Sequence, residues 1–372
     1  MTFTIITHAL LGRDKGRFYA YAPYVREMNI WTKLADKVII VAPVERQNKT
    51  PIQINFEHDD IEFKPVPPIN STNFKGKLRA IFEMPFIAFR IFGAMRKADH
   101  IHLRCPGNIG LIGCIVQIFF PSKEKTAKYA GNWDPKGDEP LSYRMQKWIL
   151  NNRFLTRNIR VLVYGEWPGM SENIKPFFTA TYRENDKIEI GPKSLSGEIR
   201  FLFVGTLTAG KRPMYAVQAI EKLRNAGFNA TLSLYGEGPA RETIQKYIAA
   251  NDLENHVRIM GAQREIVVRQ AYIESQFLLL PSKSEGWPKV VAEAMFWGCM
   301  PLATGVSCVP YMVGFGKRGM LLHVNLAEDV TNIITVLGDQ EAYDEKCRQG
   351  MLWSRQFTLD LFEDEINNLM KK

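Results

Sequence analysis

The chain has 372 residues, more than one ordinary hydrophobic core needs and enough for two domains of usual size. Hydrophobic residues make up 46% of it and charged residues 23%, a composition that indicates a folded protein and excludes an intrinsically disordered one. The net charge of +9 lies in the first half, because residues 1–190 hold 28 Lys and Arg against 19 Asp and Glu, whereas residues 191–372 hold 20 basic and 20 acidic residues.

This excess of positive charge indicates an anionic partner for the first half, such as a phospholipid surface, a phosphorylated acceptor or a nucleic acid. A solvated basic surface without a partner explains the same charge. No nucleic-acid-reading motif accompanies the basic residues, so we expect no nucleic-acid partner.

The cysteines are scattered and show neither a CxxC pair nor a metal-ligand spacing, which predicts reduced, buried thiols and no metal site. They are Cys105, Cys114, Cys299, Cys308 and Cys347. The first residues lack the features of a signal peptide. The longest apolar run, Ile109–Phe120, is too short to cross a bilayer and is interrupted by Gln117. We therefore expect a cytoplasmic protein, and peripheral contact with the cytoplasmic face of a membrane stays open.

Short apolar runs rich in β-branched residues alternate with longer helical patterns along the whole chain. In the first half, strands are predicted at Thr2–Thr7, Lys37–Ala42, Ile61–Val66, His100–Arg104, Thr126–Ala130 and Val161–Tyr164. In the second half, they are predicted at Ile199–Val204, Ala230–Tyr235, Val257–Met260, Phe277–Pro281 and Pro301–Ala303. Helices are predicted between these later strands at Met214–Ala226, Ala240–Asn251, Arg264–Glu274 and Lys289–Trp297. This alternation predicts an α/β protein with two doubly wound parallel sheets and a ligand cleft between the domains.

The polar stretch Asn185–Gly197 is the best candidate for the linker between the two domains, because Gly and Pro interrupt its periodicity. We predict an N-terminal domain at 1–187, a C-terminal domain at 188–352 and a C-terminal segment at 353–372. That segment contains a predicted helix, Leu359–Met370, which we expect to pack back on the N-terminal domain.

The segment Lys75–Lys97 is rich in Phe and basic at both ends. This pattern is typical of a surface helix that inserts Phe side chains into an anionic bilayer. An internal helix with solvated lysines at its ends fits the same pattern. Pro85 is expected to kink the helix in either case.

The segment around two glutamates in the second half carries the strongest chemical signal. Phe277–Pro281 is a buried strand, Ser282–Trp287 a polar loop that contains Glu285, and Lys289–Trp297 a helix that contains Glu293. Carboxylates accept hydrogen bonds from vicinal diols, so one glutamate suits sugar hydroxyls and the other a ribose diol. A solvated loop acid and a surface helix acid are the structural alternatives.

The ends of that helix strengthen the interpretation. Pro288 fits the first position of a helix and Gly298 fits the residue just after its end. The free N–H groups at the start of the helix then point toward the loop, where they favour a diphosphate.

Four segments in this half resemble motifs of retaining glycosyltransferase family 4, and they occur in the order of that family. Glu285–Ala294 (EGWPKVVAEA) resembles its E-x7-E signature, and Phe203–Arg212 (FVGTLTAGKR) resembles its glycine-then-lysine phosphate loop. Tyr235–Pro239 resembles its GxGP turn, and Arg258–Ala262 resembles its turn near the nucleotide base. The family has the GT-B fold, in which two Rossmann-like domains face each other across an interdomain cleft and the C-terminal one holds the donor.

The resemblance implies a nucleotide-sugar donor and requires neither a metal nor a cofactor. Gly205 lets the backbone approach a phosphate, and Lys211, with Arg212 beside it, supplies positive charge to the leaving diphosphate. Glu293 is expected to hold the ribose and Glu285 the transferred sugar. The full set of expected donor-site residues is Gly205, Thr206, Lys211, Arg212, Gly236, Gly238, Glu285, Gly286, Lys289, Val290 and Glu293, with Gly12 from the first half.

Two positions depart from the family pattern. Thr206 stands where the family often has Arg directly after the first glycine of the phosphate loop. Tyr311 stands in the place of a Glu that the family commonly shows near Val306–Val313. Arg212 is a candidate to replace the Arg that is missing at position 206. Both departures raise the alternative of an altered or lost activity.

The first half resembles the family more loosely. Leu11–Gly16, with Gly12, occupies the place of the family's glycine loop on the acceptor side of the donor sugar. Many relatives place a His near the sugar, and here Arg104 aligns with it and His102 lies two residues earlier. We count Arg104 and His102 as candidate catalytic residues with Glu285 and Lys211, although the pattern favours a core or edge histidine at His102. Trp133, after the next strand, is expected either to stack on a sugar or to pack.

The predicted function is retaining transfer of a sugar from a UDP or GDP sugar to a glycan or lipid-linked acceptor, in the synthesis of a cell-surface polysaccharide or glycolipid. One alternative keeps the fold and changes the reaction to that of an epimerase or phosphorylase. Another is a catalytically silent protein that binds a sugar nucleotide or acts as a membrane-associated scaffold.

Overall fold

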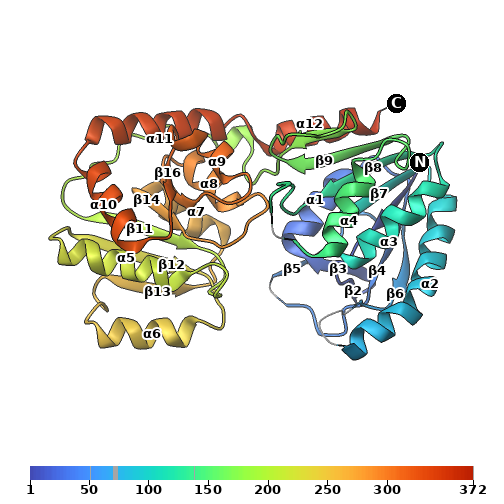
Figure 1. The fold of residues 1–372 in the computed structure, drawn as a ribbon, viewed down its shortest axis with the longest axis horizontal. Helices are drawn as coiled ribbons and strands as arrows, with labels where there is room; N and C mark the ends of the chain where they lie inside the picture. Colours follow the sequence, from blue (N-terminus) through green and yellow to red (C-terminus); the bar gives the residue numbers. More distant parts are fainter. Residues whose placement is uncertain (51, 70–73, 138, 372) are drawn as a thin grey trace. The chain divides into compact units, whose positions relative to one another are not determined.

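The computed structural model describes residues 1–50, 52–69, 74–137 and 139–371, and for residues 74–81 it describes the backbone alone. The chain folds into two compact units (Figure 1). The N-terminal unit comprises Met1–Phe177 and Glu363–Lys372, and the C-terminal unit comprises Phe178–Phe362. The interdomain cleft stays a prediction.

The N-terminal unit is built on a seven-stranded parallel sheet with the strand order β10-β9-β8-β7-β1-β4-β6. Its strands are β1 (Thr2–Ile6), β4 (Lys37–Pro43), β6 (Ile61–Val66), β7 (His100–Cys105), β8 (Glu124–Tyr129), β9 (Ile159–Tyr164) and β10 (Ile174–Phe177). The six predicted strands are confirmed to within two residues at each end, whereas β10 was not predicted.

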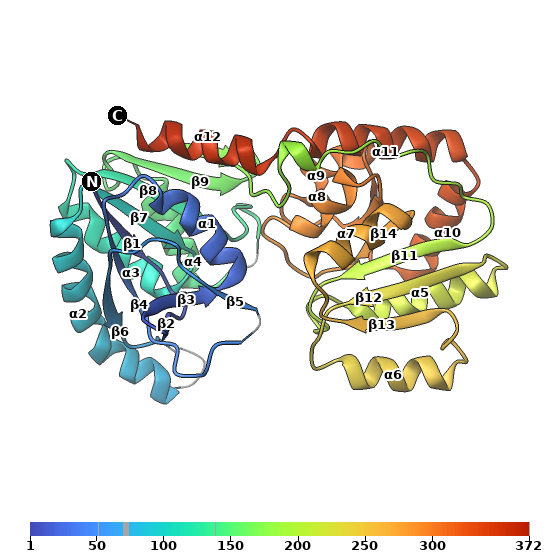
Figure 2. The same ribbon diagram turned by 180° about the vertical axis from the view of Figure 1, so that it is seen from behind.

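Helices cover both faces of this sheet (Figures 1 and 2). They are α1 (Ala22–Thr32), α2 (Phe74–Lys97), α3 (Asn108–Val116) with the short helix η1 (Gln117–Phe119), and α4 (Leu141–Leu150). The inner sides of α2, α3 and α4 share one apolar core with the strands. Helix α2 runs from Phe74 to Lys97 and continues through Pro85.

A small antiparallel sheet in this unit was not predicted. Its strands, in the order β2-β3-β5, are Gly12–Asp14, Arg17–Tyr21 and Gln53–Asn55. The sequence interpretation placed a glycine loop at Leu11–Gly16, and the structure corrects it to a β-hairpin with a tight turn at Lys15 and Gly16. Strands of three residues carry too little alternation of polar and apolar residues to be recognised from sequence.

The C-terminal unit is built on a six-stranded parallel sheet with the order β13-β12-β11-β14-β15-β16. Its strands are β11 (Ile199–Val204), β12 (Ala230–Tyr235), β13 (Val257–Gly261), β14 (Phe277–Leu280), β15 (Met300–Thr304) and β16 (Met320–Leu322). Its helices are α5 (Pro213–Asn225), α6 (Arg241–Ala250), α7 (Glu265–Glu274), α8 (Lys289–Phe296), α9 (Val309–Met312), α10 (Leu326–Leu337) and α11 (Gln340–Ser354). The last helix of the chain is α12 (Leu359–Met370), as predicted. The α/β class with two doubly wound, Rossmann-like sheets is therefore confirmed.

The division between the two units follows Phe177 rather than residue 187. The predicted linker Asn185–Gly197 is instead packed into the C-terminal unit. The Lys193 ammonium donates to the carbonyl oxygens of Tyr272 and Ser275 at 2.8 and 2.7 Å, and Leu195 is buried in the core of that unit. Irregular backbone and polar composition made this segment resemble a linker, although buried contacts hold it in place.

The five cysteines are free thiols, as predicted, and all except Cys347 are buried. Within the part of the chain that the structure describes, no helix combines the length and the apolar character needed to cross a membrane.

Candidate functional site

Three turns at the carboxyl ends of neighbouring strands meet in the C-terminal unit. They follow β11, β12 and β13, and backbone hydrogen bonds join them. Gly205 N–H donates to the Tyr235 carbonyl at 2.9 Å, and Gly236 N–H donates to the Gly261 carbonyl at 2.9 Å. Leu207 N–H donates to the Glu237 carbonyl at 3.0 Å. The carboxyl ends of the strands are where open α/β sheets bind their ligands.

Glycine is required in these turns by the close approach of backbone to backbone. A Cβ atom at Gly236 would lie 1.9 Å from the Gly205 carbonyl oxygen, and one at Gly238 would lie 2.5 Å from the Leu207 carbonyl oxygen. Both distances are far below van der Waals contact, so any side chain would separate the turns. The result is a surface of bare backbone, which a phosphate group can approach closely.

The loop after β11 is also fastened to the loop after β14. Lys283 N–H donates to the Gly210 carbonyl at 2.8 Å, and the Arg212 guanidinium donates to the Pro281 carbonyl at 3.2 Å. Arg212 adopts a left-handed backbone conformation with φ of +51°. Its contact with Pro281 braces the two loops, a role that the sequence interpretation did not assign to it.

Lys211 and Glu285 meet where these two loops join. The Lys211 Nζ atom lies 2.5 Å from Glu285 Oε1, and the side chains are 29% and 8% exposed. These residues are 74 positions apart in the chain and belong to two different motifs. A nearly buried carboxylate needs a cation beside it, so Lys211 neutralises Glu285 and leaves its own ammonium partly open to solvent.

The other glutamate of the pair, Glu293, lies half-buried on α8 and faces the segment that follows Phe178. Its two carboxylate oxygens accept hydrogen bonds from Thr181 Oγ1 at 2.7 Å and from the Tyr272 hydroxyl at 3.2 Å. Burial raises the pKa of Glu293, against the opposing effects of these hydrogen bonds and of Lys289. The hollow beside it is about 10 Å³, room for about one water. Each oxygen keeps a second lone pair for another donor.

The first turn of α8 carries Lys289 and Val290, both half-buried. Pro288 directly precedes the helix as its N-cap rather than forming its first residue, a shift of one position from the prediction. The carbonyl oxygen of Gly286, in the loop before it, accepts hydrogen bonds from Ser307 Oγ at 3.1 Å and from Cys308 Sγ at 2.8 Å. The turn after β15 therefore supports the glutamate loop from its far side.

The two residues that depart from the family pattern lie in different surroundings. Thr206 is exposed in the loop after β11. Tyr311, on α9, packs edge-on against the Trp353 ring with their centroids 6.0 Å apart. The aromatic contact gives Tyr311 a packing role that a glutamate would not fill.

In the N-terminal unit, His102 is fully buried. Its Nδ1 atom lies 2.9 Å from Thr126 Oγ1, and its ring lies 4.5 Å from the Trp31 ring centroid to centroid. Burial, followed by the charge of Arg104, holds its pKa well below the usual value, so it stays neutral. The structure therefore favours a core histidine over a ligand contact, and the catalytic role of His102 stays a prediction.

Arg104, in contrast, lies at the carboxyl end of β7 and forms an ion pair with Glu27 at 2.5 Å. The exposed His8 is the second residue after β1 and lies near enough to feel the charge of Arg104. Loss of solvent around the ring, followed by the positive charge of Arg104, lowers the pKa of His8. A Cβ atom at Gly107 would lie 2.9 Å from the His8 ring. The sequence analysis did not consider His8. A histidine just after the first strand of a parallel sheet lies at the edge where such sheets bind ligands, and this position could have indicated it.

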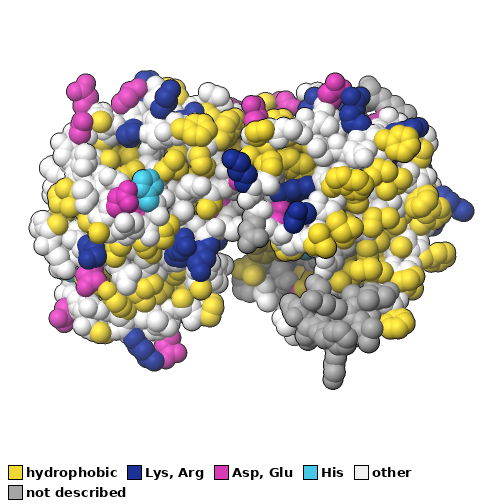
Figure 3. Space-filling view, in the orientation of Figure 1, with side chains coloured by type: hydrophobic (Ala, Val, Ile, Leu, Met, Phe, Trp, Pro, Cys, Tyr) yellow, Lys and Arg dark blue, Asp and Glu magenta, His cyan; other side chains and the backbone are white. Residues whose placement is uncertain are grey.

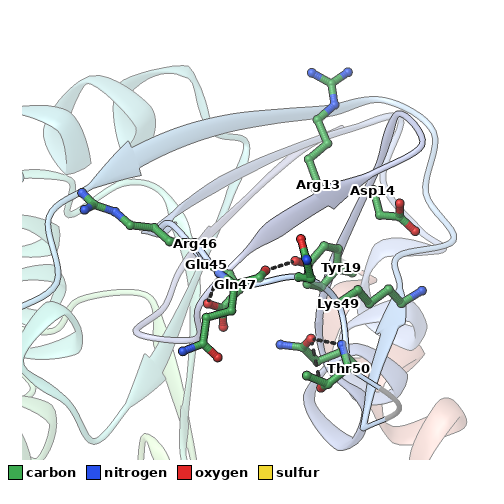
Figure 4. Close-up of a pocket in the computed structure, with 10 residues that line it drawn as sticks. Arg13, Asp14, Tyr19, Glu45, Arg46, Gln47, Lys49 and Thr50 are labelled. Carbon is green, nitrogen blue, oxygen red and sulfur yellow. Dashed lines mark hydrogen bonds between the residues drawn. The ribbon is translucent and has the colours of Figure 1, made fainter.

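Gly12 lies in β2 against the Tyr19 ring, where a Cβ atom would be 2.1 Å from the ring. The same hairpin lines a hollow of about 730 Å³ with residues 45–50 and 53 (Figure 4). The Tyr19 hydroxyl donates to the Gln47 carbonyl at 2.8 Å across one side of it. Trp133, the other aromatic singled out, is buried and packs edge-on against Tyr129 at 4.9 Å, so its packing interpretation is confirmed.

Comparison with known proteins gives consistent results. Residues 185–350 match the family model of the glycosyl transferases group 1. The chain is 27% identical to an uncharacterized glycosyltransferase of Methanocaldococcus jannaschii over 164 residues, which are 44% of this chain and 45% of that protein. It is 26% identical to an amylovoran biosynthesis glycosyltransferase of Erwinia amylovora over 155 residues, 40% of this chain and 38% of that protein. The matches thus span less than half the length of these relatives.

Among solved structures, the Anabaena protein HepE in complex with UDP and glucose is similar over nearly the full length. The TM-score is 0.67, with 16% sequence identity, 99% of this chain covered and 98% of that one. At this identity the likeness shows the fold.

Proposed function

We propose that this chain, whose residues 185–350 carry a domain of the group 1 glycosyl transferases and whose fold is GT-B, transfers a hexosyl group from a nucleotide diphosphate sugar to an acceptor. The proposed donor is a UDP or GDP sugar, the stereochemistry at its anomeric carbon is retained, and no metal takes part. The resemblance of four motifs to retaining glycosyltransferase family 4 supports both the retained stereochemistry and a reaction without a metal.

The observation that carries this proposal is the contact of Lys211 with Glu285 beside the glycine turns. When the bond between the sugar and the diphosphate breaks, negative charge grows on the leaving phosphate oxygen. A cation held next to these glycine turns stabilises that charge more in the transition state than in the ground state. Glu285, held by the same lysine, is positioned to accept hydrogen bonds from the sugar hydroxyls.

We propose a glycan or a lipid-linked acceptor, and a role in the synthesis of a cell-surface polysaccharide or glycolipid on the cytoplasmic face of a membrane. A glycan or lipid-linked acceptor draws support from the hollow beside Tyr19, because its lining includes Arg13, Arg46 and Lys49, whose side chains are hydrogen-bond donors for hydroxyl or phosphate groups. The biosynthetic role draws support from the Erwinia relative, whose name places it in amylovoran synthesis.

Titration calorimetry with UDP, GDP and ADP and with their sugars tests the donor site. We expect micromolar binding of one UDP or GDP sugar. Glu285→Ala should weaken the sugar nucleotide about tenfold or more and the bare nucleotide much less, since one lost hydrogen bond to a charged group is worth about 1.5–3 kcal/mol. Absence of binding by every nucleotide would favour a catalytically silent scaffold, and sugar conversion without an acceptor would favour an epimerase.

The pKa of Glu293 predicts how donor affinity changes with pH. Only the ionised carboxylate accepts hydrogen bonds from both ribose hydroxyls, and burial raises its pKa above the usual value of 4.5. Acidification should therefore weaken donor binding at a higher pH than an exposed glutamate would cause. The ratio of wild-type affinity to Glu293→Gln affinity, measured from pH 8 to pH 5, cancels the titration of the nucleotide itself. A ratio that stays constant over this range would contradict the role of Glu293 as ribose ligand.

A further inference from the structure

The outer sides of α2, α3 and α4, with η1 and the turn after α4, expose many large apolar side chains. Seven of them are between 49% and 76% exposed: Phe82, Phe86, Phe89, Phe119, Leu141, Trp148 and Phe154. Figure 3 shows hydrophobic side chains gathered over these helices on one side of the N-terminal unit, with Lys and Arg among and around them. We call this surface the aromatic face.

These residues are not needed for the core of the unit. The opposite sides of the same helices already fill it, with Ile87 and Ile91 from α2, Ile112 from α3 and Ile149 from α4. A helix that covers a sheet normally turns polar residues outward. Monomeric proteins rarely expose a contiguous apolar surface of this extent unless another body covers it.

The charges on the aromatic face have almost a single sign. Residues 82–97, 108–119 and 141–157 contain seven basic residues and one acidic residue, Glu83. Three of the basic residues form ion pairs with acids of neighbouring segments: Lys97 with Glu62, Lys147 with Glu139 and Arg153 with Glu172. The remaining four, Arg90, Arg96, Arg144 and Arg157, have no ion pair among the described residues.

Two of these arginines lie directly over the exposed rings. The Arg90 guanidinium is 5.3 Å from the centre of the Phe86 ring, and the Arg157 guanidinium is 5.2 Å from the centre of the Phe154 ring. Apolar rings that enter the acyl boundary and guanidinium groups at phosphate level are what an interfacial protein presents to an anionic bilayer.

We propose that the aromatic face docks on an anionic lipid bilayer. The exposure and the charge of the surface carry this proposal. It rests on the proposed function in one respect, which is that docking brings the enzyme to a lipid-linked acceptor. A second copy of this chain is the main rival occupant. In a symmetric dimer through this face, its unpaired arginines would approach their own equivalents, and like charges would oppose association. A bilayer rich in anionic headgroups supplies the missing negative charge.

Co-sedimentation of the full chain with vesicles tests the proposal without any donor or acceptor. We expect binding to vesicles of phosphatidylcholine with about 30% phosphatidylglycerol, and weaker binding to pure phosphatidylcholine, because each basic group near an anionic surface adds to the attraction. The double variant Phe89→Ser with Phe119→Ser should lower the partition constant about a hundredfold, because each substitution removes the free energy of burying one phenylalanine ring in the bilayer. Arg144→Glu with Arg157→Glu should lower binding to the anionic vesicles only.

Phe315→Ser is the matched control, because Phe315 is an equally exposed phenylalanine, 78%, in the C-terminal unit. It should bind vesicles like wild type. Calorimetric nucleotide binding by each variant shows that the fold and the donor site are intact, and so separates failure of docking from failure of the proposed function. Equal binding of wild type and Phe89→Ser/Phe119→Ser to vesicles, or no binding by wild type, would overturn the proposal. A wild-type dimer in light scattering that this double variant converts to monomer, without vesicle binding, would assign the face to self-association.

Discussion

Lys211→Ala is expected to lower the rate of sugar transfer by about 10²–10³, the usual loss when one fixed group that stabilises developing charge is removed. The Lys211 side chain is 29% exposed, and its ammonium lies 2.5 Å from Glu285 Oε1, where a backbone hydrogen bond and the Arg212 side chain hold two loops together. It therefore needs little rearrangement to reach a diphosphate. Because the charge it opposes grows as the sugar leaves, the loss should fall mainly on kcat and less on KM.

The difficulty with this variant is that it also leaves Glu285 without its cation. A carboxylate with 8% exposure and no partner destabilises the loop, and that alone would reduce activity. The double variant Lys211→Ala/Glu285→Gln removes both charges, so that no carboxylate is left without its cation. If Lys211 stabilises the leaving group, the double variant should melt at the wild-type temperature and remain slow. Recovery of the rate in the double variant would show that Lys211 serves only to neutralise Glu285.

Lys246→Ala provides the comparison for a lysine outside the site. Lys246 is 74% exposed on α6 and pairs with Glu242 at 2.7 Å, the kind of surface ion pair that contributes little. Its rate should match wild type within about twofold. Lys211→Ala at a rate close to that of Lys246→Ala would contradict the assignment of the diphosphate site.

The sequence predicted the parallel sheets well because buried parallel strands leave continuous apolar runs. Ile199–Val204 and Ala230–Tyr235 were predicted with the same bounds that the structure shows. The three-stranded sheet was missed, because β2 and β5 have only three residues each, and the pairing of β5 with β3 joins residues distant in sequence. A similar limit explains why Asn185–Gly197 was predicted to be a linker. The hydrogen bonds that the Lys193 ammonium donates to buried carbonyl oxygens leave no periodic pattern in the sequence.

The candidate site was predicted as a set of motifs, and the structure adds how they touch. Pattern alone could not show that Lys211 contacts Glu285, that Arg212 braces Pro281, or that Glu293 already accepts two hydrogen bonds. It also gave His102 a site role that its burial opposes. Strand periodicity places alternate residues on the same side of a sheet, but it does not say how deep each side chain lies.

Gly236→Ala is expected to abolish measurable donor binding, a loss of about a hundredfold or more. The new Cβ atom would lie 1.9 Å from the Gly205 carbonyl oxygen, and that oxygen belongs to backbone, which cannot rotate away as a side chain could. Either the turn after β12 or the loop after β11 must move. Movement breaks the hydrogen bonds from Gly205 N–H to Tyr235 and from Gly236 N–H to Gly261, and it separates the turn after β12 from the phosphate loop that carries Lys211. Overpacking of this kind also costs about 1–3 kcal/mol of folding free energy.

Gly338→Ala is the control, since Gly338 ends α10 with an ordinary backbone conformation and a Cβ atom there would meet its nearest neighbour at 3.5 Å. Its nucleotide affinity should equal that of wild type and its stability should change by less than about 0.5 kcal/mol. Amide hydrogen exchange at Gly205, Gly236 and Leu207 reports the local effect in Gly236→Ala, where these three N–H groups should exchange faster while the β12 amides stay protected. Wild-type affinity together with unchanged exchange at Gly205 would show that the turns tolerate a side chain, and the bare-backbone surface would then have no part in holding the donor phosphates.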